Sequence, residues 1–262
     1  MENQFGKTSR LRLTACLKDG KTILKDAAFT APFKVMHPFY ENKDFMTVML
    51  ISVSAGIMAG DCQVLNIKAD EGAKLELISQ SYEKIHRMGS GYAQRKTSIE
   101  IASGACLHYT PLPVIPFAGS DFRAASDIRL ADDTSELVYS EVLACGRAAH
   151  GEEFLYNNFQ NKVSIYQGKT LVYRDNSIYR PGQVNMSGYG MYEGFTHLAN
   201  IIICNKTIND NQITAIRLLM ESDDRMEGGI TLTTYGHTVI RILGKSGQAL
   251  TEMIRKITDT FE

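Results

Sequence analysis

Hydrophobic and polar residues alternate in short runs over the first two thirds of the chain, and tight polar turns separate the runs. Alternation with a period of two is typical of half-buried strands. Two such turns join pairs of alternating runs: Asp19-Gly20 between residues 11–13 and 22–24, and Gln167-Gly168 between residues 162–166 and 170–173. Since Asp-Gly favours a two-residue turn, the pattern predicts hairpins here within a mainly β protein.

An internal repeat gives this β pattern a long-range order. Residues 67–77 align with residues 99–109, which matches Leu75 to Leu107 at a spacing of 32 and Gly72 to Gly104. A third copy, residues 128–139, follows at 30 residues when Leu137 is matched to Leu107. Each copy predicts a strand, a polar turn and a second strand. A near-constant period favours stacked β-hairpins in a β-helix-like scaffold over the alternative, a plain antiparallel meander.

Two helices are predicted near the C-terminus. Ser246 can cap a helix whose apolar residues follow helical spacing: Leu250, Met253, Ile254, Ile257 and Phe261. A weaker pattern predicts a helix over about 212–221, with Ile213, Ile216 and Met220 on one face. Because no linker or low-complexity segment interrupts the chain, residues 1–262 are predicted to form a single domain.

Proline and glycine mark two segments outside the strands and helices. Proline donates no hydrogen bond to a β-ladder, so residues 111–116, with three prolines, are predicted to form an extended crossover or a sheet edge. Residues 181–194 are rich in glycine and lack a clear period, which predicts a loop.

Composition excludes several classes of partner and compartment. Lys plus Arg total 28 and Asp plus Glu 29, so the net charge of −1 gives no footprint for nucleic acid or an anionic membrane. The most apolar stretch, residues 46–60, is shorter than a bilayer span, and residues 1–10 lack the apolar core of a secretory signal. The five cysteines form no C-x-x-C pair, which favours a reduced, cytoplasmic protein without a disulfide framework.

The sequence lacks the usual catalytic signatures. It contains no phosphate-binding loop, no G-x-S-x-G turn and no H-E-x-x-H motif, and its six histidines stand apart from one another. No tight metal site is therefore predicted.

Three polar clusters interrupt the β pattern: residues 55–61, 79–84 and 141–152. Asp61 follows a glycine turn, where a carboxylate often bonds its own backbone. Glu141 continues the alternation of Leu137 and Tyr139, and a carboxylate on this apolar face is costly unless it is paired or solvated. Arg147 is a candidate ion-pair partner. Alternatively, Asp61 and Glu141 could form the carboxylate pair of a carbohydrate-active β-helix enzyme.

Five short motifs, in this order, resemble the UreD/UreH family of urease accessory proteins: residues 32–40 (PFKVMHPFY), 56–61 (GIMAGD), 79–85 (SQSYEKI), 111–117 (PLPVIPF) and 146–152 (GRAAHGE). The likeness extends from about Leu11 to at least Phe154. The PFKVM and EKIH segments are similar to the UreH form of epsilon-proteobacteria such as Helicobacter. Ala55 is one departure, because many members carry a second glycine there.

The resemblance implies a β-helix-like scaffold without catalysis of its own. Its implied partners are UreF, the GTPase UreG (through the UreF complex) and the urease apoprotein, and its implied cargo is nickel, carried in transit through a tunnel rather than as a tightly bound cofactor. By motif position the nickel route would contain Asp61, Ser79, Gln80, Glu141 and Arg147. Oxygen ligands suit transit because tight His/Cys sites would retain the metal. An interaction-only scaffold that does not conduct metal remains an alternative.

Overall fold

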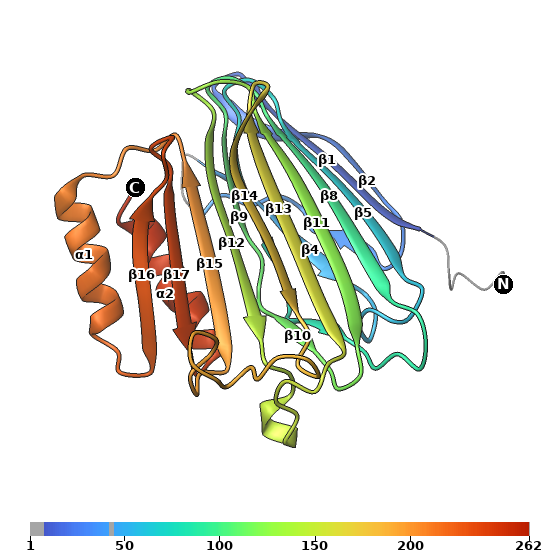
Figure 1. The fold of residues 1–262 in the computed structure, drawn as a ribbon. Helices are drawn as coiled ribbons and strands as arrows, with labels where there is room; N and C mark the ends of the chain where they lie inside the picture. Colours follow the sequence, from blue (N-terminus) through green and yellow to red (C-terminus); the bar gives the residue numbers. More distant parts are fainter. Residues whose placement is uncertain (1–7, 42–44, 262) are drawn as a thin grey trace, which may run out of the picture.

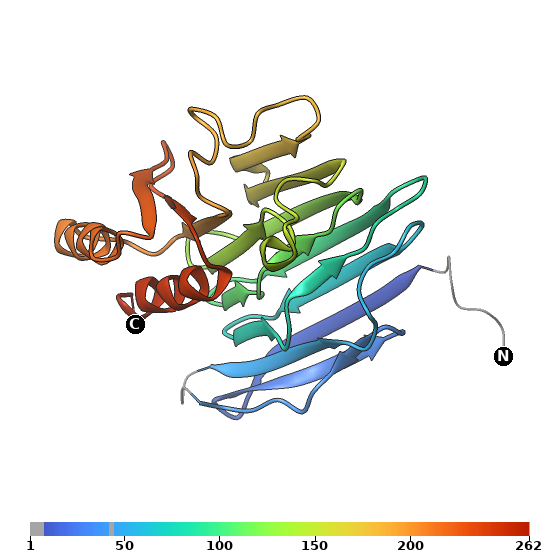
Figure 2. The same ribbon diagram turned by 90° about the horizontal axis from the view of Figure 1, so that it is seen from below.

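The computed structural model describes residues 8–41 and 45–261, so residues 1–7, 42–44 and 262 of the predicted domain lie outside the described part. Two β-sheets face each other, and the two helices lie beside the last strands, on the opposite side of the molecule from β1 and β2 (Figures 1 and 2). The prediction of a mainly β fold with two helices is confirmed. The single-domain boundary stays a prediction.

The described residues form one sheet of seven strands (sheet A) and one of ten (sheet B). Sheet A contains β1 (Ser9–Lys18), β2 (Lys21–Phe29), β5 (Cys62–Ala69), β8 (Ala93–Ile101), β11 (Asp121–Leu130), β13 (Asn158–Gln167) and β14 (Thr170–Tyr179). Sheet B contains β3 (Phe33–Val35), β4 (Met46–Ser52), β6 (Lys74–Ser79), β7 (Glu83–Ile85), β9 (Cys106–Thr110), β10 (Val114–Pro116), β12 (Glu136–Ala144), β15 (His197–Cys204), β16 (Met226–Leu232) and β17 (Thr238–Gly244).

The repeat correctly predicted the stacking register. In sheet B, Leu107 of β9 lies between Leu75 of β6 and Leu137 of β12, and both pairings are parallel. In sheet A, Ile99 of β8 likewise lies between Ile67 of β5 and Ile128 of β11. Matched positions therefore occupy successive rungs of a β-helix-like stack, and the parallel pairing rules out the antiparallel meander for these copies.

The two strands of each copy do not pair with each other as a hairpin. In the first copy β5 belongs to sheet A and β6 to sheet B, so the turn between them carries the chain from one sheet to the other. Gly72 and Gly104 sit in these turns with φ of 68° and 65°, a left-handed conformation that glycine adopts without strain. Each strand then finds its partners in the neighbouring copies, and the two apolar faces meet between the sheets.

True hairpins occur at the two predicted sites. The Asp19-Gly20 turn, with both residues at positive φ, joins β1 to antiparallel β2. The turn at Gln167-Gly168 joins β13 to antiparallel β14. These hairpins form the two edges of sheet A. Their inner strands belong to the parallel stack, because β1 pairs in parallel with β5 and β13 with β11, and only the outer strands β2 and β14 are antiparallel.

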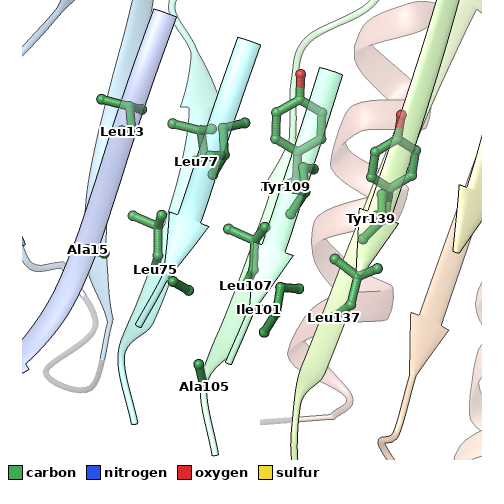
Figure 3. Packing of buried hydrophobic residues seen from close by; sticks show 14 of the residues in the cluster. Leu13, Ala15, Leu75, Leu77, Ile101, Ala105, Leu107, Tyr109, Leu137 and Tyr139 are labelled. Carbon is green, nitrogen blue, oxygen red and sulfur yellow. The ribbon is translucent and has the colours of Figure 1, made fainter. Parts of the chain in front are cut away.

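The main core fills the space between the sheets. Inward residues of neighbouring strands pack in rows, and Figure 3 shows Leu75, Leu107 and Leu137 side by side, followed along their strands by Leu77, Tyr109 and Tyr139. The three leucines are at most 1% exposed. This stacking gives each copy the apolar contacts that it lacks alone.

The helices cover the outer face of sheet B. Helix α1 (Asp210–Glu221) packs on β16, and α2 (Gly247–Asp259) packs on β12, β15 and β17 (Figure 2). All five apolar residues predicted for the second helix belong to the hydrophobic cluster between the helices and sheet B. The first helix begins two residues before its expected start, because Asn209 forms a capping box with Gln212.

Replacing Ser246 with alanine should lower the free energy of unfolding by about 1 kcal/mol. The Ser246 side chain accepts a hydrogen bond from the Ala249 N–H at the start of α2, and alanine leaves that donor unpaired. Urea denaturation measures the change. Ser246→Asp, which keeps an acceptor, should retain most of the stability, and equal losses in both variants would contradict the capping role.

The glycine-rich segment behaves as predicted, but the proline-rich segment does so only in part, because three of its residues form a strand that has a paired strand on each side and is therefore not a sheet edge. Within residues 111–116, Val114–Pro116 forms the short strand β10, which extends the end of sheet B between β7 and β12. Residues 181–194 form a series of turns without a helix or strand. Among the described residues, no helix is both long enough and apolar enough to cross a bilayer.

Candidate functional site

A cavity of about 430 Å³ lies between the two sheets. Its walls come from the carboxyl ends of the parallel strands of sheet B and from the amino ends of the facing strands of sheet A, which run the opposite way. The apolar residues of these walls belong to the main core and to a smaller hydrophobic cluster around Phe122 and Phe159. Exposed lining residues at Ser54, Ala55 and Ser81 show where it reaches solvent.

The loop beside this opening depends on Gly56. A Cβ atom at Gly56 would lie 2.5 Å from the Lys84 carbonyl oxygen, and its φ of +144° is one that other residues rarely adopt. The neighbouring Ala55 carbonyl contacts the His86 ring nitrogen Nε2 at 2.9 Å. The motif at residues 56–61 is therefore explained by close packing of two backbones beside the cavity.

Among the described residues, Glu141 is one of the two carboxylates that line the cavity. It follows Leu137 and Tyr139 on the inward face of β12, as predicted. One carboxylate oxygen accepts a hydrogen bond from the Tyr139 hydroxyl and the other from the Asn161 amide of sheet A. Burial raises the pKa of Glu141 to about 7, although these two hydrogen bonds act in the opposite direction. Glu141 is thus a potential oxygen ligand for a metal ion, with a pKa near neutral pH.

A partly buried arginine forms the second charged feature of the cavity. Arg95 of β8 pairs with Glu83 of β7, and its Nε donates to Gln63 Oε1 at 2.9 Å. The side chains of Arg95 and Glu83 are 16% and 19% exposed. Both line the cavity with Glu141.

Of the five predicted route residues, Ser79 and Glu141 line the cavity. The Ser79 hydroxyl accepts a hydrogen bond of 2.8 Å from the Leu112 N–H, which ties β6 to the proline segment. Gln80 is exposed beside the opening, and its side chain is not part of the lining.

Asp61 and Arg147 lie outside the lining. Asp61 Oδ2 accepts from the Met58 N–H at 2.8 Å, so the local backbone bond considered from the sequence is present. Arg147 pairs with Glu152 and lies 4.2 Å from the centroid of the Phe117 ring. The prediction of a Glu141–Arg147 ion pair is wrong. Arg147 lies beyond the end of β12, and its guanidinium reaches the Glu152 carboxylate instead.

Sequence reasoning missed the polar residues that sheet A contributes. Arg95 lies on the same face of β8 as Ala93, Thr97 and Ile99, because these residues are two or four positions away. Asn161 shares a face of β13 with Phe159 and Val163 in the same way. The signal that identified Glu141, a polar residue in register with apolar ones, was therefore present on both strands. It could have predicted that all three side chains face the inter-sheet space.

The side-chain atoms around the cavity that could bind a metal ion are mainly oxygen atoms. Among the described residues, no group of three or more His, Cys, Asp or Glu side chains is arranged to hold a metal ion. Asp61 and Glu141 do not form the carboxylate pair of the glycosidase alternative, because Asp61 is bonded into its own loop and does not line the cavity that holds Glu141.

The family model for "UreD urease accessory protein" matches residues 7–262. The chain belongs to the UreD family. Its relatives include the urease accessory protein UreD of Acetivibrio thermocellus, which is 40% identical over 258 residues and 98% of each chain. The urease accessory protein UreH of Helicobacter pylori strain P12 is 35% identical over 256 residues, covering 97% of this chain and 95% of the relative. UreD of Flavobacterium johnsoniae is 31% identical over 253 residues.

These matches extend the UreD resemblance into the C-terminal third, where the motifs gave little signal. The matched region includes both helices and the strands β15, β16 and β17. The likeness to the UreH form is confirmed by the Helicobacter relative. Three UreD-like motifs, at residues 56–61, 79–85 and 111–117, meet around the open end of the cavity.

Proposed function

We propose that this chain is an urease accessory protein that acts in the maturation of urease without catalysing a reaction itself. In this proposal it passes nickel through the inter-sheet cavity to the urease apoprotein, in the cytoplasm. UreF would bind it directly, and the GTPase UreG would join through the UreF complex. The family membership supports the role in urease maturation; the cavity supports the metal route.

The observation that carries the nickel route is the position of Glu141. An ionised carboxylate inside a cavity whose walls are mostly apolar attracts a divalent cation strongly, because little water screens the charge. The Ser79 hydroxyl and the Asn161 amide oxygen add weak neutral oxygen ligands along the same walls. Nickel binds such ligands less tightly than imidazole or thiolate, so it can enter and leave.

Nickel would meet Ser79 and Glu141 inside the cavity. Contacts of nickel with Asp61, Gln80 and Arg147 stay predictions, and the positions of these residues would make them contacts outside the cavity rather than within it. The interaction-only scaffold is the competing function. It makes the opposite prediction for the cavity, namely that polar substitutions there leave nickel delivery unchanged.

Glu141→Ala should lower nickel loading of urease roughly tenfold or more, since it removes the charged ligand of the route, while the complex with UreF and UreG still assembles. Bound nickel and urease activity are measured after activation with each purified complex. Glu136→Ala serves as the matched control: it removes another carboxylate of β12 that does not line the cavity, and it should leave nickel loading unchanged. Normal loading by the Glu141 variant would favour the interaction-only scaffold.

A further inference from the structure

Arg95 places a permanent positive charge inside a cavity through which a cation would have to pass. It lies on the inward face of β8, held between Gln63 of β5 and Glu83 of β7. Its guanidinium is also 5.8 Å from the centroid of the Phe122 ring. Three separate elements therefore fix this charge in place.

Three of the four described charged residues that line the cavity act on one phenol, and the fourth, Lys84, is exposed. Arg95, Glu83 and Glu141 all act electrostatically on the Tyr109 hydroxyl, whose pKa burial raises to about 12. The Tyr109 ring stacks on the Tyr139 ring, with 5.4 Å between centroids, and the two hydroxyls point the same way (Figure 3). The Tyr139 hydroxyl donates to Glu141. The two carboxylates and the guanidinium thus share one region of the cavity.

Without Arg95 this region would contain two carboxylates, with amide oxygens from Gln63 and Asn161 beside them. Oxygen sites bind divalent cations more tightly as the number of charged ligands rises. A buried carboxylate without a partner is also costly, and a metal ion would relieve that cost. Such a cavity would retain a divalent cation instead of releasing it.

We propose that Arg95 is a tethered cation that occupies Glu83 and so prevents the cavity from trapping nickel. The guanidinium neutralises one of the two carboxylates, which leaves Glu141 as the exchangeable ligand. Arg95 in this way sets the affinity of the cavity for nickel. The proposal rests on the cavity being the nickel route, and it deepens that function.

A purely structural role for the pair has to be distinguished from this one. The Arg95–Glu83 pair joins sheet A to β7, so removing Arg95 also removes a tie between the sheets. A structural tie predicts lower stability and unchanged or weaker nickel binding. A tethered cation predicts tighter nickel binding, which a loss of structure does not produce.

The test is equilibrium dialysis of Ni²⁺ against the full chain, purified with UreF if it needs its partner, in four forms. Arg95→Met should bind nickel roughly tenfold or more tightly than the unmodified protein, because Glu83 is freed. Arg95→Lys, which keeps the positive charge, should bind as weakly as the unmodified protein. The double variant Arg95→Met/Glu83→Gln should return to weak binding, because the freed carboxylate is gone. Nickel should also raise the Tm of Arg95→Met more than that of the double variant.

The inference is overturned if Arg95→Met binds nickel no more tightly than the unmodified protein. It is equally overturned if the double variant binds as tightly as Arg95→Met. Circular dichroism and the melting transition show whether each variant is folded, and the double variant, in which neither residue of the former ion pair is charged, provides a folded comparison if Arg95→Met is unstable. Urease activation is measured separately. Tighter nickel binding without any change in activation would uphold the tethered cation and reject the nickel route.

Discussion

Replacing Leu107 with alanine should lower the free energy of unfolding by about 3 to 5 kcal/mol. Leu107 is fully buried, and it is the middle member of the row formed with Leu75 and Leu137. The side chains around it belong to strands of the parallel stack and cannot shift independently, so the space left by the truncation stays open. Urea denaturation followed by circular dichroism gives the change in stability.

Leu17→Ala is the matched control, because Leu17 is 48% exposed on β1. This substitution should lower the free energy of unfolding by less than about 1 kcal/mol. Leu107→Val, with a smaller truncation, should fall between the two. If Leu107→Ala cost no more than Leu17→Ala, the copies would not depend on one another's side chains for their stability.

The register of the stack was predictable because the repeat aligned residues that later proved to be neighbours. A match of Leu75, Leu107 and Leu137 in sequence becomes a row in space when each copy sits on the last in the same orientation. The partition into two sheets was not predictable. A strand–turn–strand pattern is compatible both with a hairpin and with a turn that passes between sheets, and only the contacts with other copies decide which forms.

The cavity could be predicted only in part. Alternation placed Glu141 on an inward face, because strand geometry fixes which side each residue faces. The partners of Arg147 and Asp61 could not be predicted, since they depend on how the chain leaves a strand or turns back on itself. Arg147 meets Glu152 through such a turn, and Asp61 meets the Met58 N–H in the same way.

Glu141→Gln should change the pH dependence of stability. Burial raises the pKa of Glu141 from 4.5 to about 7 in the folded protein, so the folded state holds its proton more tightly than the unfolded chain does. The stabilisation from this proton is fully present below about pH 4.5 and is lost as the pH rises through about 7. Glutamine has no proton to lose, so the variant should become more stable relative to the unmodified protein by on the order of 3 kcal/mol between pH 4.5 and 8.

Unfolding free energies of both proteins at pH 5 and pH 8 measure this difference. A loss of about 1 kcal/mol at both pH values is expected in addition, because glutamine has a single acceptor oxygen and cannot accept from both Tyr139 and Asn161. Glu152→Gln is the control. The hydrogen bond from Arg147 lowers the pKa of Glu152 to about 2, so Glu152 stays ionised over this whole range and its removal should have the same effect at both pH values. If Glu141→Gln also shifted stability equally at pH 5 and pH 8, the carboxyl would be solvated in the folded protein, and the cavity wall would lack the buried, exchangeable ligand on which the nickel route depends.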